Sequence, residues 1–355
     1  MRAPPAGVGL NPGFIMRWHC DVITGSGIAA MMSRRQLGVA AAAALAMPCV
    51  RPARAAQRLR LGVAQVANSH YGAAATALAD GLRAGTDGRV QVEVFTDGAL
   101  GSEEAMLAGV RAGTLDLTIV ASGLLGTYAP EVGLLDLPFL FRDAAHARAV
   151  LDGPVGQAYA AAAAAQGVPV LAWAENGVRH LTANRPVRTA ADLRGLKLRI
   201  MPAPLLLEAF RAMGADAASL SFPLVYEALR VGKFEAEENP IPIIIQSRFY
   251  EVQSHLILTG HTYSAACIAA SPDLLEDLGP ADRRVLADAA RAGVAKSREF
   301  VTAAEVTGLA RLRDGGMTVI TDPDRASFVE AAAAAEAGAA LRFGADRIAR
   351  LRGAA

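Results

Sequence analysis

Cysteine, blocks of like charge and long apolar runs are scarce in this sequence, and each shortage excludes a class of protein. The 355 residues include three cysteines, and only Cys267 lies beyond residue 56, so that part must be stabilised by its core rather than by internal disulfides. The formal charge is +1 without a basic arm, which argues against nucleic acid as a partner. No later run of about 18 apolar residues predicts a membrane span.

The usual catalytic and metal-binding motifs are also missing. The chain has no G-x-S-x-G, H-E-x-x-H, Walker A, G-x-G-x-x-G or C-x-x-C pattern. His255, His261 and Cys267 are near one another in the sequence, but their spacing matches no zinc motif. We therefore expect that the protein binds no metal or cofactor and is not an enzyme. A catalytic triad of residues that are distant in the sequence stays an open alternative.

The N-terminal region resembles an export signal rather than folded protein. Residues 1–30 lack periodicity and are interpreted as a non-native extension before the paired Met31 and Met32. Residues 31–55 contain twin arginines at 34–35, an apolar run and an A-x-A exit, which predicts a twin-arginine-like signal peptide cleaved near Ala55. An ordinary secretory signal is the alternative. The remaining chain is predicted to be periplasmic.

Beyond residue 56, short β-prone runs alternate with helical stretches, which predicts an α/β fold with parallel sheets. Strands are expected at 58–64, 90–95, 116–121, 168–173 and 196–201. Helices are expected at 70–84, 103–112, 144–166 and 205–213, with another around Tyr226. Asn176-Gly177 is a turn signal. Pro280 to about Leu312 predicts a helix long enough to bridge two domains, unless an undetected break divides it. The tail from Asp324 to Leu351 also has a helical pattern.

Five short segments occur in a distinctive order. They are Asn176-Gly177-Val178-Arg179-His180-Leu181-Thr182, Leu193-Arg194-Gly195-Leu196-Lys197-Leu198-Arg199, Glu238-Asn239-Pro240, Phe249-Tyr250-Glu251-Val252-Gln253 and Leu258-Thr259-Gly260-His261. Together with Asp136-Leu137-Pro138-Phe139-Leu140-Phe141, this series resembles the DctP-type solute-binding subunits of TRAP transporters, the C4-dicarboxylate-binding family. The resemblance extends from about Leu59 to beyond Gly316. One departure is Lys233 to Glu237, where the family usually carries D-G.

The resemblance implies a two-lobed periplasmic-binding-protein-like fold with an interlobe cleft and a long bridging helix. Residues 56–176 with 265–304 would form lobe 1, and 177–264 with 305–355 would form lobe 2. The protein would be a monomer that captures a small organic acid and delivers it to the membrane subunits of a TRAP permease. The acid could be a C4-dicarboxylate, a sugar acid or a related carboxylate.

Arg199 is the first candidate for binding that acid. It lies at the end of the β-prone run 196–200, just before Met201-Pro202, where side chains of α/β proteins meet ligands. A guanidinium there can hold a carboxylate with two parallel hydrogen bonds, which a lysine cannot do. Arg199 also matches the substrate-binding arginine of the family. A surface arginine at a strand end is the structural alternative.

Five further residues are candidates for the binding site. Arg179 matches the family's second arginine, and its alternative is a structural ion pair. Asn239 could donate to a ligand oxygen or cap a turn, and Phe222 matches an aromatic position beside the acid but could belong to the core. His70 could contact substrate or stand in solvent at a helix start, where Ser69 could cap the helix. Gln65 is a weaker candidate in a loop after a strand.

Two other functions stay open at this stage. An exported enzyme acting on a small organic acid would use Glu235, Glu237, Glu238 or His70 as its acid or base. A ligand-sensing input subunit of a membrane sensor would share the same fold and ligand.

Overall fold

The computed structural model describes residues 56–354. The predicted extension, the signal peptide and its cleavage near Ala55 lie outside this part of the chain. The strands are β1 (Gln57–Gly62), β2 (Val90–Phe95), β3 (Leu117–Ala121), β4 (Val170–Ala183), β5 (Lys197–Ile200), β6 (Asp216–Ser219), β7 (Ala236–Pro240), β8 (His255–Ala270) and β9 (Thr318–Ile320). The α-helices are α2 (His70–Gly85), α3 (Glu103–Arg111), α4 (Ala144–Asp152), α5 (Pro154–Ala165), α6 (Pro204–Ala212), α7 (Val225–Arg230), α8 (Ile241–Gln246), α9 (Pro272–Asp277), α10 (Pro280–Asp314), α11 (Arg325–Phe343) and α12 (Ala345–Gly353).

One mixed sheet connects the two parts of the fold, in the order β2-β1-β3-β8-β4-β7-β5-β6, with β9 beside β8. β1 pairs in parallel with β2 and β3, and β5 pairs in parallel with β6 and β7. β8, however, is antiparallel to β3 and β4, and β4 is antiparallel to β7. The predicted α/β class is confirmed, but an all-parallel sheet was wrong because two long strands return through its centre.

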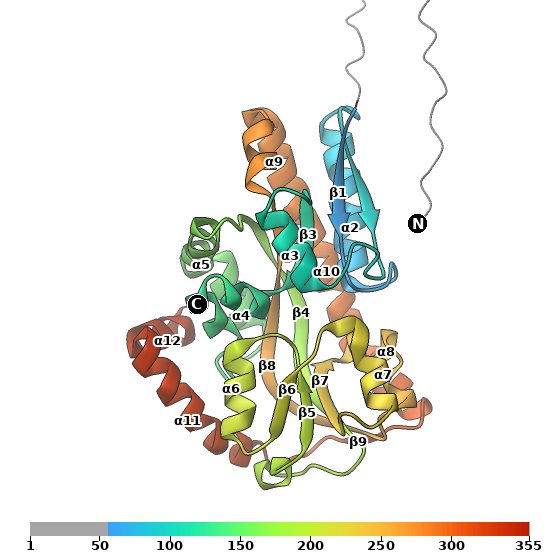
Figure 1. Cartoon of the computed structure of the whole chain (residues 1–355), viewed down its shortest axis with the longest axis vertical. Coiled ribbons are helices and arrows are strands. Elements are labelled where there is room, and N and C mark those ends of the chain that lie inside the picture. Colours follow the sequence, from blue (N-terminus) through green and yellow to red (C-terminus); the bar gives the residue numbers. More distant parts are fainter. Residues whose placement is uncertain (1–55, 355) are drawn as a thin grey trace, which may run out of the picture. The chain divides into compact units, whose positions relative to one another are not determined.

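The two central strands β4 and β8 extend from the β1–β3 part of the sheet to the β5–β7 part (Figure 1). β4 has 14 residues and β8 has 16, so the predicted strand 168–173 covers only the start of β4. Asn176-Gly177 lies inside β4 and not in a turn, which corrects that prediction. The register between β4 and β8 shifts between Glu175 and Gly177, and Gly177 has a φ of 126°. A bulge accounts for the glycine there, because it bends a strand without ending it.

Helix α10 is unbroken over 35 residues, and the break considered above is absent. It packs against α2 in one part of the fold and against α8 in the other, so it bridges the two parts as predicted. Small residues permit this close packing. A Cβ atom at Gly293 would lie 2.7 Å from the carbonyl oxygen of Ala74, and one at Gly308 would collide with Ile241.

Two predicted helices are each divided in the structure. The stretch 144–166 forms α4 and α5, since Gly153 ends the first helix and Pro154 begins the second. Proline has no amide hydrogen to continue a helix but is well suited to its first turn. The tail from Asp324 forms α11 and α12, which Gly344 separates with a φ of 93°. Both predicted helices were too long, because the periodic pattern of apolar residues continues across a break of one residue.

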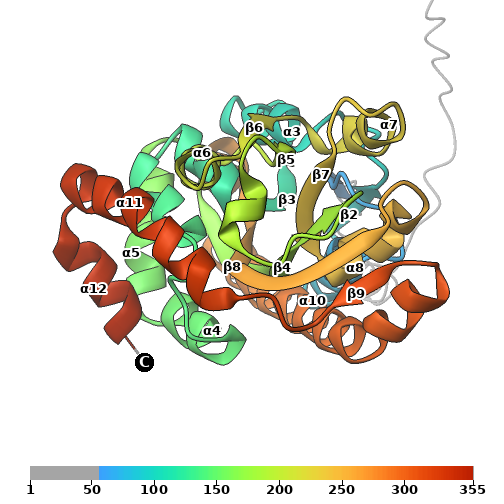
Figure 2. The same ribbon diagram turned by 90° about the horizontal axis from the view of Figure 1, so that it is seen from below.

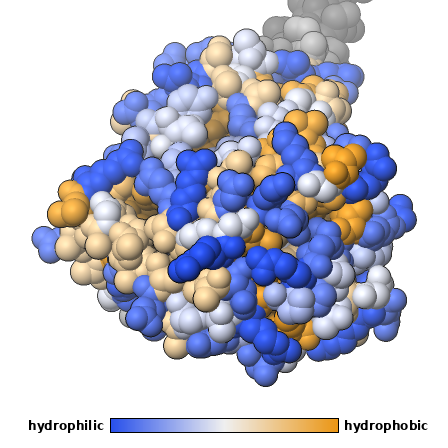
Figure 3. Space-filling view, turned by 60° about the horizontal axis from the view of Figure 1, so that its bottom comes forward, coloured by the Kyte–Doolittle hydropathy of each residue, from blue (hydrophilic) through white to orange (hydrophobic). Residues whose placement is uncertain are grey.

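Among the described residues, three hydrophobic clusters cover the faces of the sheet. One lies between the sheet, α2 and α10, another around α7 and α8, and the largest against α3 to α6 and α11. Figure 2, which shows the fold from below, places α11 and α12 at one side and β9 near the end of α10. Polar side chains cover most of the face in Figure 3, interrupted by separate apolar patches. Within residues 56–354, no helix has the length and apolar character to cross a bilayer.

Candidate functional site

A small cavity lies where the β1–β3 and β5–β7 parts of the fold meet. Several of its residues follow the carboxyl ends of parallel strands, where α/β sheets usually bind ligands. Its volume of about 20 Å³ is room for about one water molecule. The lining residues are Gln65, Glu103, Glu104, Ala121, Leu124, Asn176, Arg179, Arg199, Met201, Pro202, Phe222, Asn239 and Ile243.

Five of the six predicted ligand-binding residues line this one cavity. They are Gln65, Arg179, Arg199, Phe222 and Asn239. They come from the loop after β1, from β4, β5 and β7, and from the short 3₁₀ turn at 222–224. The fold therefore brings together residues that are up to 174 positions apart in the numbering of the chain.

Arg199 is a buried cation held by neutral partners. Its Nε and Nη2 donate to the carbonyl oxygen of Leu220 at 2.9 and 2.7 Å, which fixes the plane of the guanidinium. None of the ion pairs among the described residues includes Arg199, and no hydrogen bond there engages its Nη1. Burial lowers its pKa to about 10, so it is charged at neutral pH. A buried guanidinium without a carboxylate partner is electrostatically suited to an anion.

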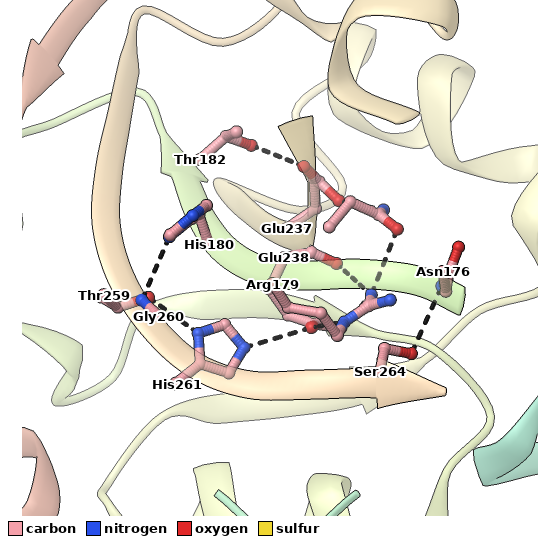
Figure 4. A network of polar contacts seen from close by, with 11 residues as sticks. Asn176, Arg179, His180, Thr182, Glu237, Glu238, Thr259, Gly260, His261 and Ser264 are labelled. Carbon is pink, nitrogen blue, oxygen red and sulfur yellow. Dashed lines mark hydrogen bonds and ion pairs between the residues drawn. The ribbon is translucent and has the colours of Figure 1, made fainter. Parts of the chain in front are cut away.

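Arg179, in contrast, is paired within the protein. Its Nη2 donates to Oε1 of Glu238 at 2.9 Å, and its Nε contacts Oε2 of Glu238 (Figure 4). Its Nη2 also donates to Oδ1 of Asn239 at 3.2 Å. Burial opposes the charge of Glu238, but Arg179 and the hydrogen bond from His261 lower its pKa to about 2. The ion pair predicted as the alternative for Arg179 is present, although the side chain also lines the cavity.

His261 completes this network from β8. Its Nε2 lies 3.3 Å from Oε2 of Glu238, and its Nδ1 lies 2.7 Å from the hydroxyl of Thr259 (Figure 4). Burial lowers the pKa of His261, so the ring is neutral and donates from Nε2 to the carboxylate. The hydroxyl of Thr259 then donates to Nδ1. This arrangement fixes the orientation of Glu238 and, through it, of Arg179.

Asn239 occupies the end of β7, just before Pro240 and the start of α8. Its Nδ2 donates to Oε2 of Glu237 at 2.5 Å, while its Oδ1 accepts from Arg179. One hydrogen of Nδ2 is left for the cavity. Oε1 of Glu237 lies 2.9 Å from the hydroxyl of Thr182, and burial with the charge of Glu238 raises the pKa of Glu237 to about 7. Asn239 is thus oriented by two neighbours and does not cap a turn.

The opposite wall of the cavity presents acceptors. Gln65 is buried and donates through Nε2 to Oε1 of Glu103 at 2.9 Å, whereas its Oε1 has no hydrogen-bond partner within residues 56–354. Glu103 also accepts from the backbone N–H of Ala121, and burial raises its pKa. Glu104 accepts from the hydroxyl of Ser221 at 2.5 Å. Phe222 adds an apolar contact and packs edge-on against Phe249.

His70 lies behind the cavity wall. It is buried at the first position of α2, where the hydroxyl of Ser69 caps the helix by accepting from the N–H of Gly72. Its Nε2 is 3.0 Å from Oδ1 of Asn176, which itself lines the cavity. Burial lowers the pKa of His70 to about 4. A neutral His70 therefore acts on the cavity through Asn176, and it does not stand in solvent.

Sequence reasoning missed three lining residues with polar side chains, Glu103, Glu104 and Asn176. The two acids follow Ser102, which caps α3. Acidic residues in the first turn are common in any helix because they interact with its dipole, so this signal does not distinguish a site. Asn176 belongs to the first quoted motif, but its bulged strand was interpreted as a turn. Among the described residues, no cluster of three or more potential metal ligands is present.

The two-part α/β fold, the bridging helix and a cavity between the parts with a buried guanidinium define the class of two-lobed solute-binding proteins. The chain belongs to the family of bacterial extracellular solute-binding proteins, family 7 (DctP), whose model matches residues 62–339. This membership confirms the resemblance inferred from the motifs.

Curated and solved relatives agree with the family. A solute-binding protein from Verminephrobacter eiseniae is 40% identical over 83% of this chain and 89% of that protein. The 2,3-diketo-L-gulonate-binding periplasmic protein YiaO from Escherichia coli is 37% identical, over 78% of this chain and 85% of that protein. A TRAP periplasmic solute-binding protein from Polaromonas sp. JS666, solved with D-erythronate, superposes with a TM-score of 0.82. It is 40% identical over 83% of this chain and 98% of that chain.

Proposed function

We propose that this protein is the periplasmic solute-binding subunit of a TRAP transporter, that it captures a small organic acid and that it delivers the acid to a membrane permease. The observation that carries the proposal is Arg199, a buried guanidinium that lines the cavity and has no carboxylate partner among the described residues. Relatives named for 2,3-diketo-L-gulonate and D-erythronate support an acid as the ligand.

In this proposal Arg199 binds the carboxylate of the solute. The carbonyl oxygen of Leu220 holds the guanidinium in one orientation, so less side-chain entropy is lost on binding. Arg179 adds positive potential, but most of its N–H groups already donate to Glu238 and Asn239. Asn239 donates to a ligand oxygen, Phe222 packs beside the carbon chain and Gln65 contacts the far end. His70 acts indirectly by holding Asn176.

Lobe movement follows from the size of the site. A cavity of about 20 Å³ cannot admit a four-carbon acid, so the lobes have to separate for entry and close around the ligand. The bulge in β4 between Glu175 and Gly177 offers a bending point between lobe 1 (56–176 with 265–304) and lobe 2 (177–264 with 305–355). Closure lowers the local dielectric and strengthens the pair between Arg199 and the carboxylate.

Calorimetry with carboxylic acids and neutral sugars tests this function. An acid is expected to bind wild type, and Arg199→Ala is expected to lose about 2–5 kcal/mol of binding free energy, roughly 30-fold or more in Kd. Arg83→Ala, on the exposed side of α2, is the matched control and should bind as wild type does. Binding of a neutral sugar that does not depend on Arg199 would contradict the proposal.

A further inference from the structure

The two walls of the cavity differ in their hydrogen-bonding groups. The wall from β5 and β7 offers donors, namely Nη1 of Arg199 and the remaining hydrogen of Asn239 Nδ2. The wall from the loop after β1 and the start of α3 offers acceptors, namely Gln65, Glu103 and Glu104. A ligand that fills the cavity therefore needs acceptors at one end and donors at the other.

Of these acceptors, Oε1 of Gln65 is the one whose position and orientation are best defined. Gln65 is 5% exposed, and its amide orientation is set because Nε2 donates to Oε1 of Glu103 at 2.9 Å. The carbonyl oxygen then has no hydrogen-bond partner among the residues that the structure describes. Buried polar atoms are normally hydrogen-bonded, so this oxygen is placed to accept a hydrogen bond from a ligand group. A hydroxyl can donate that hydrogen bond, whereas an ionised carboxylate cannot.

Negative charge on the same wall acts against a second carboxylate. Burial raises the pKa of Glu103, whereas the hydrogen bonds that it accepts from Gln65 and Ala121 and the charge of Arg199 favour its charged form. Glu104 lines the cavity beside it and accepts from Ser221. An acidic group of the ligand at this end would face two carboxyl groups at close range, and like charges in a desolvated site are strongly unfavourable.

We propose that the ligand is a hydroxylated monocarboxylate, held by its carboxylate on Arg199 and by a distal hydroxyl that donates to Oε1 of Gln65, and that dicarboxylates of the same length are excluded. This inference rests on the proposed function and narrows its ligand class. Arg199 selects for the first carboxylate, and the pair of Gln65 and Glu103 selects against a second one. The site thereby distinguishes hydroxylated monocarboxylates from dicarboxylates, which Arg199 alone would not do.

Carbon-matched acids test the inference. Calorimetry compares aldonates of four to six carbons with the α,ω-dicarboxylates and the unsubstituted monocarboxylates of the same lengths. At least one aldonate is expected to bind about 100-fold or more tightly than both matched acids, because a site built for a hydroxyl strongly rejects analogues without it. A dicarboxylate that binds more tightly than every aldonate, and that loses binding in Arg199→Ala, overturns this inference and leaves the proposed function intact.

Two variants test whether Gln65 and Glu103 cause the preference for aldonates over dicarboxylates. Gln65→Met keeps the length of the side chain and is expected to weaken aldonate binding about 10-fold or more, with little change for the unsubstituted acid. Glu103→Gln removes the charge and is expected to improve dicarboxylate binding about 10-fold. Gln157→Met, exposed on α5, is the control, and thermal unfolding checks that each variant folds. Unchanged aldonate affinity in Gln65→Met overturns the inference, and failure of every acid to bind wild type overturns both the inference and the proposed function.

Discussion

Arg179 and Glu238 form a buried ion pair between β4 and β7, with Nη2 of the arginine 2.9 Å from Oε1 of the glutamate. Arg199, on the next strand of the same sheet, shares the cavity, but its only hydrogen-bond partner in the described part of the chain is the backbone carbonyl of Leu220. Two arginines in one site thus have different electrostatic states. One is neutralised by the protein, and the other is left with its charge available.

The charge of Arg199 is expected to destabilise the ligand-free protein. Burial lowers its pKa to about 10, which means that the folded protein disfavours the charged form. We predict that Arg199→Met raises the free energy of unfolding by about 1–3 kcal/mol while it weakens acid binding about 30-fold or more. Urea unfolding without ligand measures this change. A variant less stable than wild type would indicate that the hydrogen bonds to Leu220 outweigh the cost of burying the charge.

The pair of Arg179 and Glu238 should behave in the opposite way. Glu238→Leu leaves the guanidinium of Arg179 buried without its counter-charge, and we predict a loss of about 3–5 kcal/mol in the free energy of unfolding. The double variant Arg179→Met/Glu238→Leu should recover most of that loss, because no charge then remains unpaired. Urea unfolding of the two single variants and the double variant gives the coupling energy. Additive losses would contradict the pairing.

Glu237 should make stability depend on pH. Burial and the charge of Glu238 raise its pKa from 4.5 to about 7, so the folded protein holds this proton more tightly than the unfolded chain. The stabilising contribution is complete below pH 4.5 and is lost as the pH rises to about 7. Glu237→Gln mimics the neutral acid, so its stability relative to wild type should increase by about 1–3 kcal/mol across that range and then stay constant.

Denaturant unfolding at several pH values measures this difference. Glu93→Gln, an exposed position on β2, is the control for the loss of a carboxylate. A stability difference between Glu237→Gln and wild type that does not change with pH would show that Glu237 is already ionised in the folded protein.

The close packing of α10 on α8 should not tolerate a side chain at Gly308. A Cβ atom there would collide with Ile241, so we predict that Gly308→Ala lowers the free energy of unfolding by about 1–3 kcal/mol. Gly338→Ala in α11, where nothing lies within 4 Å, is the matched control and should stabilise by about 0.5–1 kcal/mol. Thermal unfolding measures both. Equal effects would mean that α10 can shift away from α8.

The sequence predicted those elements that are determined by local signals. Ser69 marks the start of α2, and Pro280 marks the start of α10. The return of β8 through the middle of the sheet depends on pairing between distant strands, for which the sequence has no local signal. Arg199 could be predicted because the end of a β-prone run is a local signal. The pairing of Gln65 with Glu103, 38 positions later, could not be predicted, because it depends on the order of strands in the finished sheet.

The small volume of the cavity, about 20 Å³, also has a consequence for the rate of ligand binding. In the lobe movement proposed above, a four-carbon acid enters only when the lobes separate, so each binding event waits for that opening. The observed rate of binding should therefore reach a plateau at high ligand concentration, at the opening rate, and should not keep rising with concentration. Once the lobes have closed, release waits for the same opening.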